Sequence, residues 1–300
     1  MIRIDLQVDL RYEIDAPGGD FIFAIHAAHM PSQIVSAERL IFSQPITPEI
    51  HTDPFTGGRC MRLHAGPGEL LVTYGATVDL HHHVADPAQL VEVPVSRLPP
   101  EVLGYIYPSR YCQSDRLVKM AIREFGHLRQ GHARVMAIQD WVRQRVTFRS
   151  NTSNGNTSAV DTLIEQVGVC RDFAHLMIAL CRAVNIPARI ATGTDYGADP
   201  VLGPPDFHAY VEVYLGDRWY LFDPSGTGIP MGFVRIATGR DAADVAFATI
   251  FGSVRSQAPM IRALAVNDPA NGRVLPYHCS EALSTDTGVR QLPFAPTRIA

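Results

Sequence analysis

The stretch GVCRDFAHLMIALCRAVNIPAR, residues 168–189, decides the fold of this 300-residue chain. Its apolar side chains recur at the i, i+3, i+4, i+7 spacing of a helix with one buried stripe. The stripe comprises Phe173, Leu176, Met177, Leu180 and Val184. We therefore predict a central helix over 170–184, which the following Asn-Ile-Pro ends. Cys170 lies three residues before Phe173, so its thiol leans along the same stripe at the first turn.

A cysteine at the start of a helix is well placed for nucleophilic chemistry, because unpaired backbone amides and the helix dipole favour the thiolate. Gly168 just before it lets backbone or substrate approach closely. Most free cysteines are nevertheless small buried apolar residues, so Cys170 alone does not identify a site. The 5 cysteines of the chain are scattered and form no CxxC pair, which argues against a disulfide framework or a zinc knuckle.

A predicted hairpin supplies the partners that a nucleophilic cysteine needs. Strands over 208–215 and 218–223 flank the turn Gly216-Asp217. Counting outward from a two-residue turn puts His208 and Asp223 on one face as diagonal neighbours, roughly 7–8 Å apart at the backbone. A three-residue loop would shift the pairing by one residue and put His208 and Asp223 on opposite faces of the hairpin. A carboxylate that holds one imidazole nitrogen leaves the other free to take a thiol proton, which is the logic of a catalytic triad.

The rest of the chain divides into segments of different pattern. Residues 1–95 contain short strand-like runs between Gly- and Pro-rich turns, which favours a β-sandwich or barrel. The runs are Ile2–Leu10, Phe21–His26, Leu70–Tyr74 and Thr77–His83. A proline-dotted linker over 96–110 leads to a core over 111–254, and residues 255–300 form an extension of mixed pattern. Within the core we predict helices over 114–125, 132–146 and 159–166 and a strand over 188–193, so the fold class is α+β.

Three segments resemble the bacterial transglutaminase-like superfamily, whose members are often described as cysteine proteases. They are residues 168–189, DFHAYVEVYLGDRWYLFDPSG at 206–226 and GRDAADV at 239–245. The resemblance covers roughly 111–254, and residues 1–95 resemble the β-rich region that often precedes this core. It implies a papain-like core with helices packed on an antiparallel sheet. It also implies Cys170 as nucleophile, His208 as general base and acid, and Asp223 as the orienting carboxylate. Many relatives have Trp where Tyr210 stands, a change that should leave the triad alone.

The expected reaction is attack of the Cys170 thiolate on an amide carbonyl, followed by resolution of the thioester by water or an amine. We favour hydrolysis of peptide or other amide bonds. Glutamine–amine transfer by a true transglutaminase, and a non-catalytic binding protein that keeps the fold, are the alternatives. The Cys170 amide is the natural first oxyanion donor, and Gln166 and Tyr111 are candidates for the second. The chemistry needs no cofactor and no metal. Loops over 150–158 and 195–207 are predicted to rim the cleft.

The composition limits the classes of binding partner that we expect. A net charge of −4 with 19% charged residues gives no reason to expect nucleic acid or an anionic membrane as a partner, so an amide-containing substrate is the expected one. The N-terminus alternates like a strand, unlike a secretory signal, and we expect a cytoplasmic protein. The three histidines at 81–83 are interpreted as surface strand residues because no further ligand accompanies them. His175 is expected to be buried and hydrogen-bonded on the far side of the central helix. The sequence indicates no oligomeric state.

Overall fold

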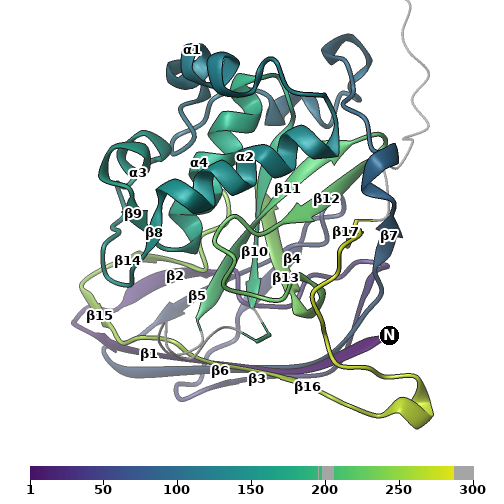
Figure 1. Ribbon diagram of the computed structural model, residues 1–300. Helices are drawn as coiled ribbons and strands as arrows, with labels where there is room; N and C mark the ends of the chain where they lie inside the picture. Colours follow the sequence, from purple (N-terminus) through teal and green to yellow (C-terminus); the bar gives the residue numbers. More distant parts are fainter. Residues whose placement is uncertain (195, 198–205, 287–300) are drawn as a thin grey trace, which may run out of the picture.

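Sheets lie below a group of helices in the computed structural model (Figure 1), which describes residues 1–194, 196–197 and 206–286. The lower part is a sandwich of two antiparallel sheets. The first is ordered β15 (Val254–Ser256), β1 (Ile2–Ile14), β6 (Gly68–Leu80) and β3 (Gln33–Phe42), with β16 (Met260–Ala265) also paired to β1. The second is ordered β14 (Ala248–Phe251), β2 (Gly19–Phe23), β5 (Arg59–Ala65) and β4 (Glu49–Thr52).

The alternation read from the N-terminal sequence explains why β1 builds a sandwich core. Every second residue of β1 from Ile2 to Ile14 is buried, and the side chains between them are partly or fully exposed. The buried set packs with Phe21 and Phe23 from the facing sheet in one apolar cluster. Period-two alternation turns one face of a strand inward, so the pattern itself specifies which face is buried.

Strands β3, β4 and β5 were not predicted, and the two runs predicted at 70–74 and 77–83 belong to the single strand β6. All four residues of β4 are exposed and most of β3 is exposed, so neither strand shows a buried face in its sequence. The buried positions of β6 keep the same alternation on both sides of Gly75, so the strand continues through it. Alternation of apolar and polar residues indicates a strand with one buried face, so it gives no signal for an exposed strand.

The upper part packs helices on a third antiparallel sheet, ordered β12, β11, β10 and β13. Its strands are β10 (Ala188–Thr194), β11 (Phe207–Leu215), β12 (Arg218–Phe222) and β13 (Val234–Gly239). The helices are α1 (Ser114–Phe125), α2 (His132–Arg145), α3 (Ala159–Glu165) and α4 (Cys170–Ala183). Every residue of α4 from Asp172 to Ala183 is buried, because α1, α2 and α3 surround it and the sheet lies beneath it (Figure 1). The predicted central helix is confirmed.

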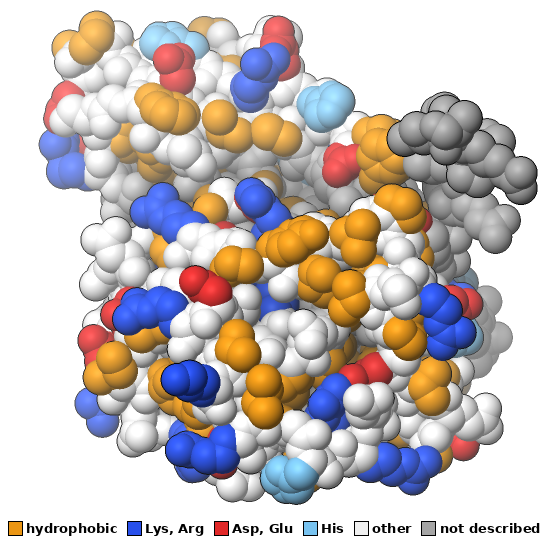
Figure 2. Space-filling model, turned by 90° about the horizontal axis from the view of Figure 1, so that it is seen from above, with side chains coloured by type: hydrophobic (Ala, Val, Ile, Leu, Met, Phe, Trp, Pro, Cys, Tyr) orange, Lys and Arg blue, Asp and Glu red, His pale blue; other side chains and the backbone are white. Residues whose placement is uncertain are grey.

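Short elements complete the chain. The pairs β8 (Thr147–Phe148) with β9 (Val167–Gly168) and β7 (His83–Ala85) with β17 (Ala282–Ser284) form two-stranded sheets. Single 3₁₀ turns cover 87–89, 95–97, 103–105, 230–232 and 269–271. No helix in the described part of the chain is long and apolar enough to span a bilayer. Seen from the helix side, apolar side chains gather on the exposed face among Lys and Arg residues (Figure 2).

The hairpin of β11 and β12 has the predicted two-residue turn. Tyr214 lies opposite Trp219 and Glu212 opposite Leu221, as the outward count required. Gly216 adopts a positive φ of 64°, which favours glycine at this turn position. The correct parity brings the side chains of residues 208 and 223 to the same side of the sheet.

A buried charge cluster links this sheet to the C-terminal segment. Glu212 is fully buried and accepts hydrogen bonds from Arg189 Nε at 2.7 Å and from Arg235 Nη2. The same Arg235 nitrogen donates to Thr285 Oγ1 at 2.6 Å. The carboxylate is thus paired with two guanidinium groups, which a buried charge requires.

The chain returns to the sandwich after the core. Strand β14 pairs with β2, and β15 and β16 both pair with β1, so residues 248–265 complete the sheets that the N-terminus began. The sequence placed residues up to 254 with the core, and the division at 95, 110 and 254 stays a prediction.

Candidate active site

Cys170 is the first residue of α4 and is partly buried. Its Sγ lies 3.9 Å from the Phe207 carbonyl oxygen, on the first residue of β11. The turn before it is held by Asp172, whose Oδ2 accepts a hydrogen bond from Val169 N at 2.9 Å. A Cβ on Gly168 would lie 2.7 Å from the Asp172 Cβ, so glycine is needed there for this cap to form. The close approach expected at Gly168 is therefore that of the Asp172 side chain.

His208 and Asp223 meet at the same end of the hairpin. His208 Nε2 lies 3.6 Å from Asp223 Oδ1, and the two side chains are only 7% and 5% exposed. The Cys170 thiol, whose Sγ lies 3.9 Å from the carbonyl oxygen of the residue before His208, is close enough to raise the pKa of the imidazole. The structure brings together all three residues that the sequence singled out. The separation of 3.6 Å is that of an ion pair and is longer than a normal hydrogen bond.

Burial and charge act in opposite directions on His208. Burial lowers its pKa, but the nearby Cys170 sulfur and the Asp223 carboxylate raise it further than burial lowers it. The resulting pKa lies well above the ordinary value of 6.5. An imidazolium with a raised pKa is the proton donor that a departing amine needs at neutral pH.

Asp223 is kept ionised by several donors. Burial raises its pKa, but His208, Ser225 and the Gly228 amide outweigh burial and lower the pKa to about 2. Ser225 N and Oγ donate to Asp223 Oδ1 at 3.0 and 2.6 Å, and Gly228 N donates to Oδ2 at 3.1 Å. These bonds fix the orientation of the carboxylate that faces the imidazole.

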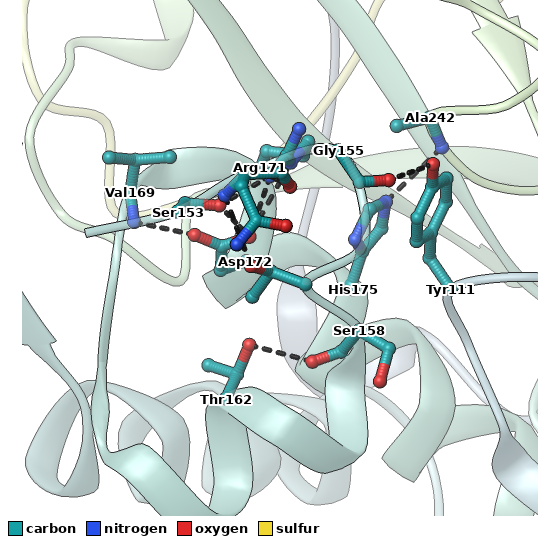
Figure 3. A network of polar contacts seen from close by, with 12 residues as sticks. Tyr111, Ser153, Gly155, Ser158, Thr162, Val169, Arg171, Asp172, His175 and Ala242 are labelled. Carbon is teal, nitrogen blue, oxygen red and sulfur yellow. Dashed lines mark hydrogen bonds and ion pairs between the residues drawn. The ribbon is translucent and has the colours of Figure 1, made fainter. Parts of the chain in front are cut away.

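A polar network ties the 150–158 loop to the first turn of α4 (Figure 3). Ser153 Oγ donates to Asp172 Oδ1 at 2.9 Å, and Arg171 Nη2 donates to Ser153 Oγ and, at 2.8 Å, to the Asn154 carbonyl oxygen. Asp172 therefore caps the cysteine turn and anchors the loop at once. Asp172 was not among the predicted site residues, although an acidic residue at the third position of a helix is a capping signal.

The segment GRDAADV, residues 239–245, contacts Tyr111 and the His175 side chain of α4. Its Asp241 accepts a hydrogen bond from Tyr111 N at 2.8 Å, and Ala242 N donates to His175 Nε2 at 3.1 Å. The rings of Tyr111 and His175 stack with centroids 5.1 Å apart (Figure 3). Burial lowers the pKa of His175 to about 3, so this imidazole is neutral. The prediction of a buried, hydrogen-bonded His175 is confirmed.

A cleft of about 840 Å³ opens over Cys170 and His208. Ser150, Asn151, Ser153 and Gly155 line one side of it, so the first predicted loop does rim the cleft. Of the second loop, Asp206 and Phe207 line it, and positions 195 and 198–205 lie outside the described residues.

The two candidates for the second oxyanion donor are placed differently. Gln166 is exposed and is not among the described residues that line the cleft. Tyr111 lines the cleft, but its hydroxyl donates to the Gly155 carbonyl oxygen at 2.7 Å. Among the described residues, no group of three or more His, Cys, Asp or Glu side chains could hold a metal ion.

Comparisons with known proteins identify the family. Residues 121–224 match the transglutaminase-like superfamily, and residues 2–101 match the N-terminal domain of bacterial transglutaminase. The crystal structure of a putative cysteine protease from Cytophaga hutchinsonii is 39% identical, with a TM-score of 0.87 over 94% of this chain and 97% of that one. The chain therefore belongs to the transglutaminase-like superfamily. The predicted family, and the α+β fold with a β-rich region before the core, are confirmed.

Curated relatives match over shorter stretches. An uncharacterized protein of Mycobacterium leprae is 27% identical over 146 residues, which is 47% of this chain and 52% of that protein. An uncharacterized protein of Mycobacterium tuberculosis is 31% identical over 110 residues, or 33% of this chain and 35% of its own length. The chain thus spans about half the length, or less, of these relatives.

Proposed function

We propose that this chain is a cysteine-nucleophile acyl-transfer enzyme that hydrolyses peptide or other amide bonds. The observation that carries the proposal is the meeting of three side chains. Cys170 at the start of α4 is close enough to raise the pKa of His208, and His208 Nε2 lies 3.6 Å from Asp223 Oδ1. A nucleophile, a base and an orienting acid in this order form the arrangement of a triad.

In the first half-reaction the Cys170 thiolate attacks the amide carbonyl carbon, and the new C–S bond gives a tetrahedral oxyanion. The raised pKa of His208 supplies an imidazolium, which donates its proton to the departing amine as the C–N bond breaks. The products are a thioester on Cys170, a free amine and a neutral imidazole. Asp223, with its pKa lowered to about 2, stays ionised and holds the ring in place.

The oxyanion is stabilised by backbone amides at the start of α4. Cys170 and Arg171 are the first two residues of this helix, and both line the cleft. Across the described residues, neither amide donates a hydrogen bond to a protein acceptor. Unpaired amides of a first helical turn carry partial positive charge and are suited to an oxyanion. The Arg171 amide thus takes the role for which the sequence offered Gln166 and Tyr111.

In the second half-reaction water attacks the thioester while neutral His208 takes its proton. The carboxylic acid leaves, and the thiolate–imidazolium pair is restored. A primary amine in place of water would give transamidation instead. Incubation with a glutamine peptide and a labelled amine separates the two reactions. We expect deamidation or cleavage without incorporation of label, and incorporated label would replace hydrolysis by transamidation.

An unbiased peptide-library digest read by mass spectrometry tests the proposal directly. We expect cleavage by the wild-type protein and none by the Cys170→Ala variant, which removes the nucleophile and leaves the fold unchanged. A second measurement needs no substrate. Iodoacetamide should alkylate Cys170 rapidly at pH 6.5, and His208→Ala should slow that alkylation at least tenfold because the ion-pair partner of the thiolate is lost. An equal alkylation rate in both proteins would instead support a non-catalytic binding role.

A further inference from the structure

One wall of the cleft comes from the sandwich and not from the helical core. Ala24, which follows β2, and Phe247 and Ala248 at the start of β14 line the same cleft as Cys170. Ala24 N donates a hydrogen bond to the Phe247 carbonyl oxygen at 3.0 Å, which fixes the two segments to each other. The sandwich is therefore part of the substrate-binding surface as well as a neighbouring unit.

An aromatic pair places this wall next to the reacting atoms. The ring of Phe247 stacks on Phe207 with centroids 4.6 Å apart. Phe207 directly precedes His208, and its carbonyl oxygen lies 3.9 Å from Cys170 Sγ. A ligand whose carbonyl reaches the sulfur consequently has its neighbouring atoms beside the aromatic pair.

The wall is apolar and unusually open. Phe247 is 39% exposed, although aromatic side chains are mostly buried. The described residues beside it on this wall are apolar: Ala24, Ala246, Ala248 and Ala258. Among the charged residues that line the cleft, Asp206 directly precedes Phe207, and its Oδ1 accepts a hydrogen bond from Phe207 N at 2.7 Å. The facing rim is polar, with Ser150, Asn151 and Ser153. One side of the cleft is thus suited to an apolar side chain and the other to the polar backbone of a peptide.

We propose that Phe247 is a specificity-determining residue and that the substrate is an amide with a bulky apolar side chain, aromatic or long aliphatic, next to the attacked carbonyl. This inference rests on the proposed function, because it names the substrate class of the same cleft. Contact with the apolar side chain covers the exposed ring of Phe247. The Ala residues around it leave space for a large group where larger side chains would fill the wall.

Matched peptides that differ only at the residue beside the scissile bond, Phe or Leu against Ser or Lys, test the substrate class. We expect the apolar peptides to be cleaved with a kcat/KM roughly 10 to 100 times higher, the range of one apolar pocket. Phe247→Ala should reduce that preference at least fivefold. Phe251→Ala, which removes a 56% exposed aromatic from the same strand outside the described cleft lining, should leave it unchanged. Cleavage of all four peptides at similar rates would overturn the inference and leave the proposed hydrolysis standing.

A measurement without turnover separates the two claims. Alkylation of Cys170 by N-benzylmaleimide should exceed that by N-methylmaleimide at least fivefold, and Phe247→Ala should bring the ratio to near one while the iodoacetamide rate stays constant. If the alkylation ratio behaves in this way but none of the four peptides is cleaved, the apolar site is upheld and the proposed hydrolysis is refuted. Ala246→Glu provides a second variant, because a carboxylate on the wall should also reduce the ratio. A ratio near one in the wild-type protein, or an unchanged ratio in both variants, would refute the inference.

Discussion

Replacing Asp223 by Asn tests how the carboxylate controls the imidazole, because it removes the charge and keeps the shape of the side chain. Asp223 is 6% exposed, so solvent screens its interaction with His208 only weakly. The pKa of Asp223 falls from 3.8 to about 2 on folding. At about 1.36 kcal/mol per unit, this difference corresponds to roughly 2 kcal/mol at neutral pH.

The two partners contribute stability in different pH ranges. The lowered pKa of Asp223 contributes stability above its unfolded value of 3.8, and this is lost as the pH falls through about 2. The raised pKa of His208 contributes stability below 6.5, which is lost as the pH rises through the folded pKa. Between these limits both contributions are present. Asp223→Asn should therefore reduce the free energy of unfolding at pH 6 by about 2 kcal/mol.

The assay is an NMR titration of histidine labelled with ¹⁵N, which needs no substrate. In Asp223→Asn the midpoint of the His208 titration should fall by about one to two pH units, because the interaction between two charged groups is reciprocal. The loss in kcat/KM should be roughly 10- to 60-fold, the factor that corresponds to that energy. Asp244→Asn, which removes a partly exposed partner of Arg240, is the matched control and should leave the His208 midpoint in place. An Asp223→Asn midpoint equal to or above that of the wild type would refute the reasoning.

Three further predictions concern the residues that support the site and the fold. Asp172→Ala removes the hydrogen bonds from Val169 N and from Ser153 Oγ. The rates of Cys170 alkylation and of amide turnover should both fall roughly 10- to 100-fold, with thermal unfolding measured in parallel. Unaltered rates would show that Asp172 is not needed to position Cys170. Glu212→Gln should cost about 3–5 kcal/mol in urea unfolding, because it leaves Arg235 buried without its counter-charge. The exposed Glu49→Gln should cost less than about 0.5 kcal/mol, and equal losses for both would contradict the argument. Burial lowers the pKa of His26 to about 4, so the unfolded chain takes up the proton first and stability falls as the pH drops below 6.5. The urea midpoint should be lower at pH 4.5 than at pH 7, and His26→Phe should make that difference smaller; an unchanged difference would exclude His26 as its source.

Local pattern was sufficient for the elements that carry the proposed chemistry. The stripe from Phe173 to Leu180 predicts α4, because the i, i+3, i+4, i+7 spacing is a local signature of a helix. The turn Gly216-Asp217 sets the parity of the hairpin, and parity alone decides that residues 208 and 223 share a face. The position of Cys170 at the start of the helix follows from the same pattern. The helix, the hairpin turn and the helix start each depend on residues that are close in the sequence, so they can be predicted from it directly.

Tertiary structure alone decided what surrounds those residues. Strands β3 and β4 are largely exposed and have no buried face that a pattern could reveal. Phe247 lines the same cleft as Cys170 because β14 returns to pair with β2, and no local period records a pairing between segments so far apart in the chain. The role of Asp172 likewise depends on Ser153, which a loop brings back to the helix. Helices and tight turns are determined by neighbours in sequence, whereas the walls of the cleft are determined by contacts that form only when distant segments pack together.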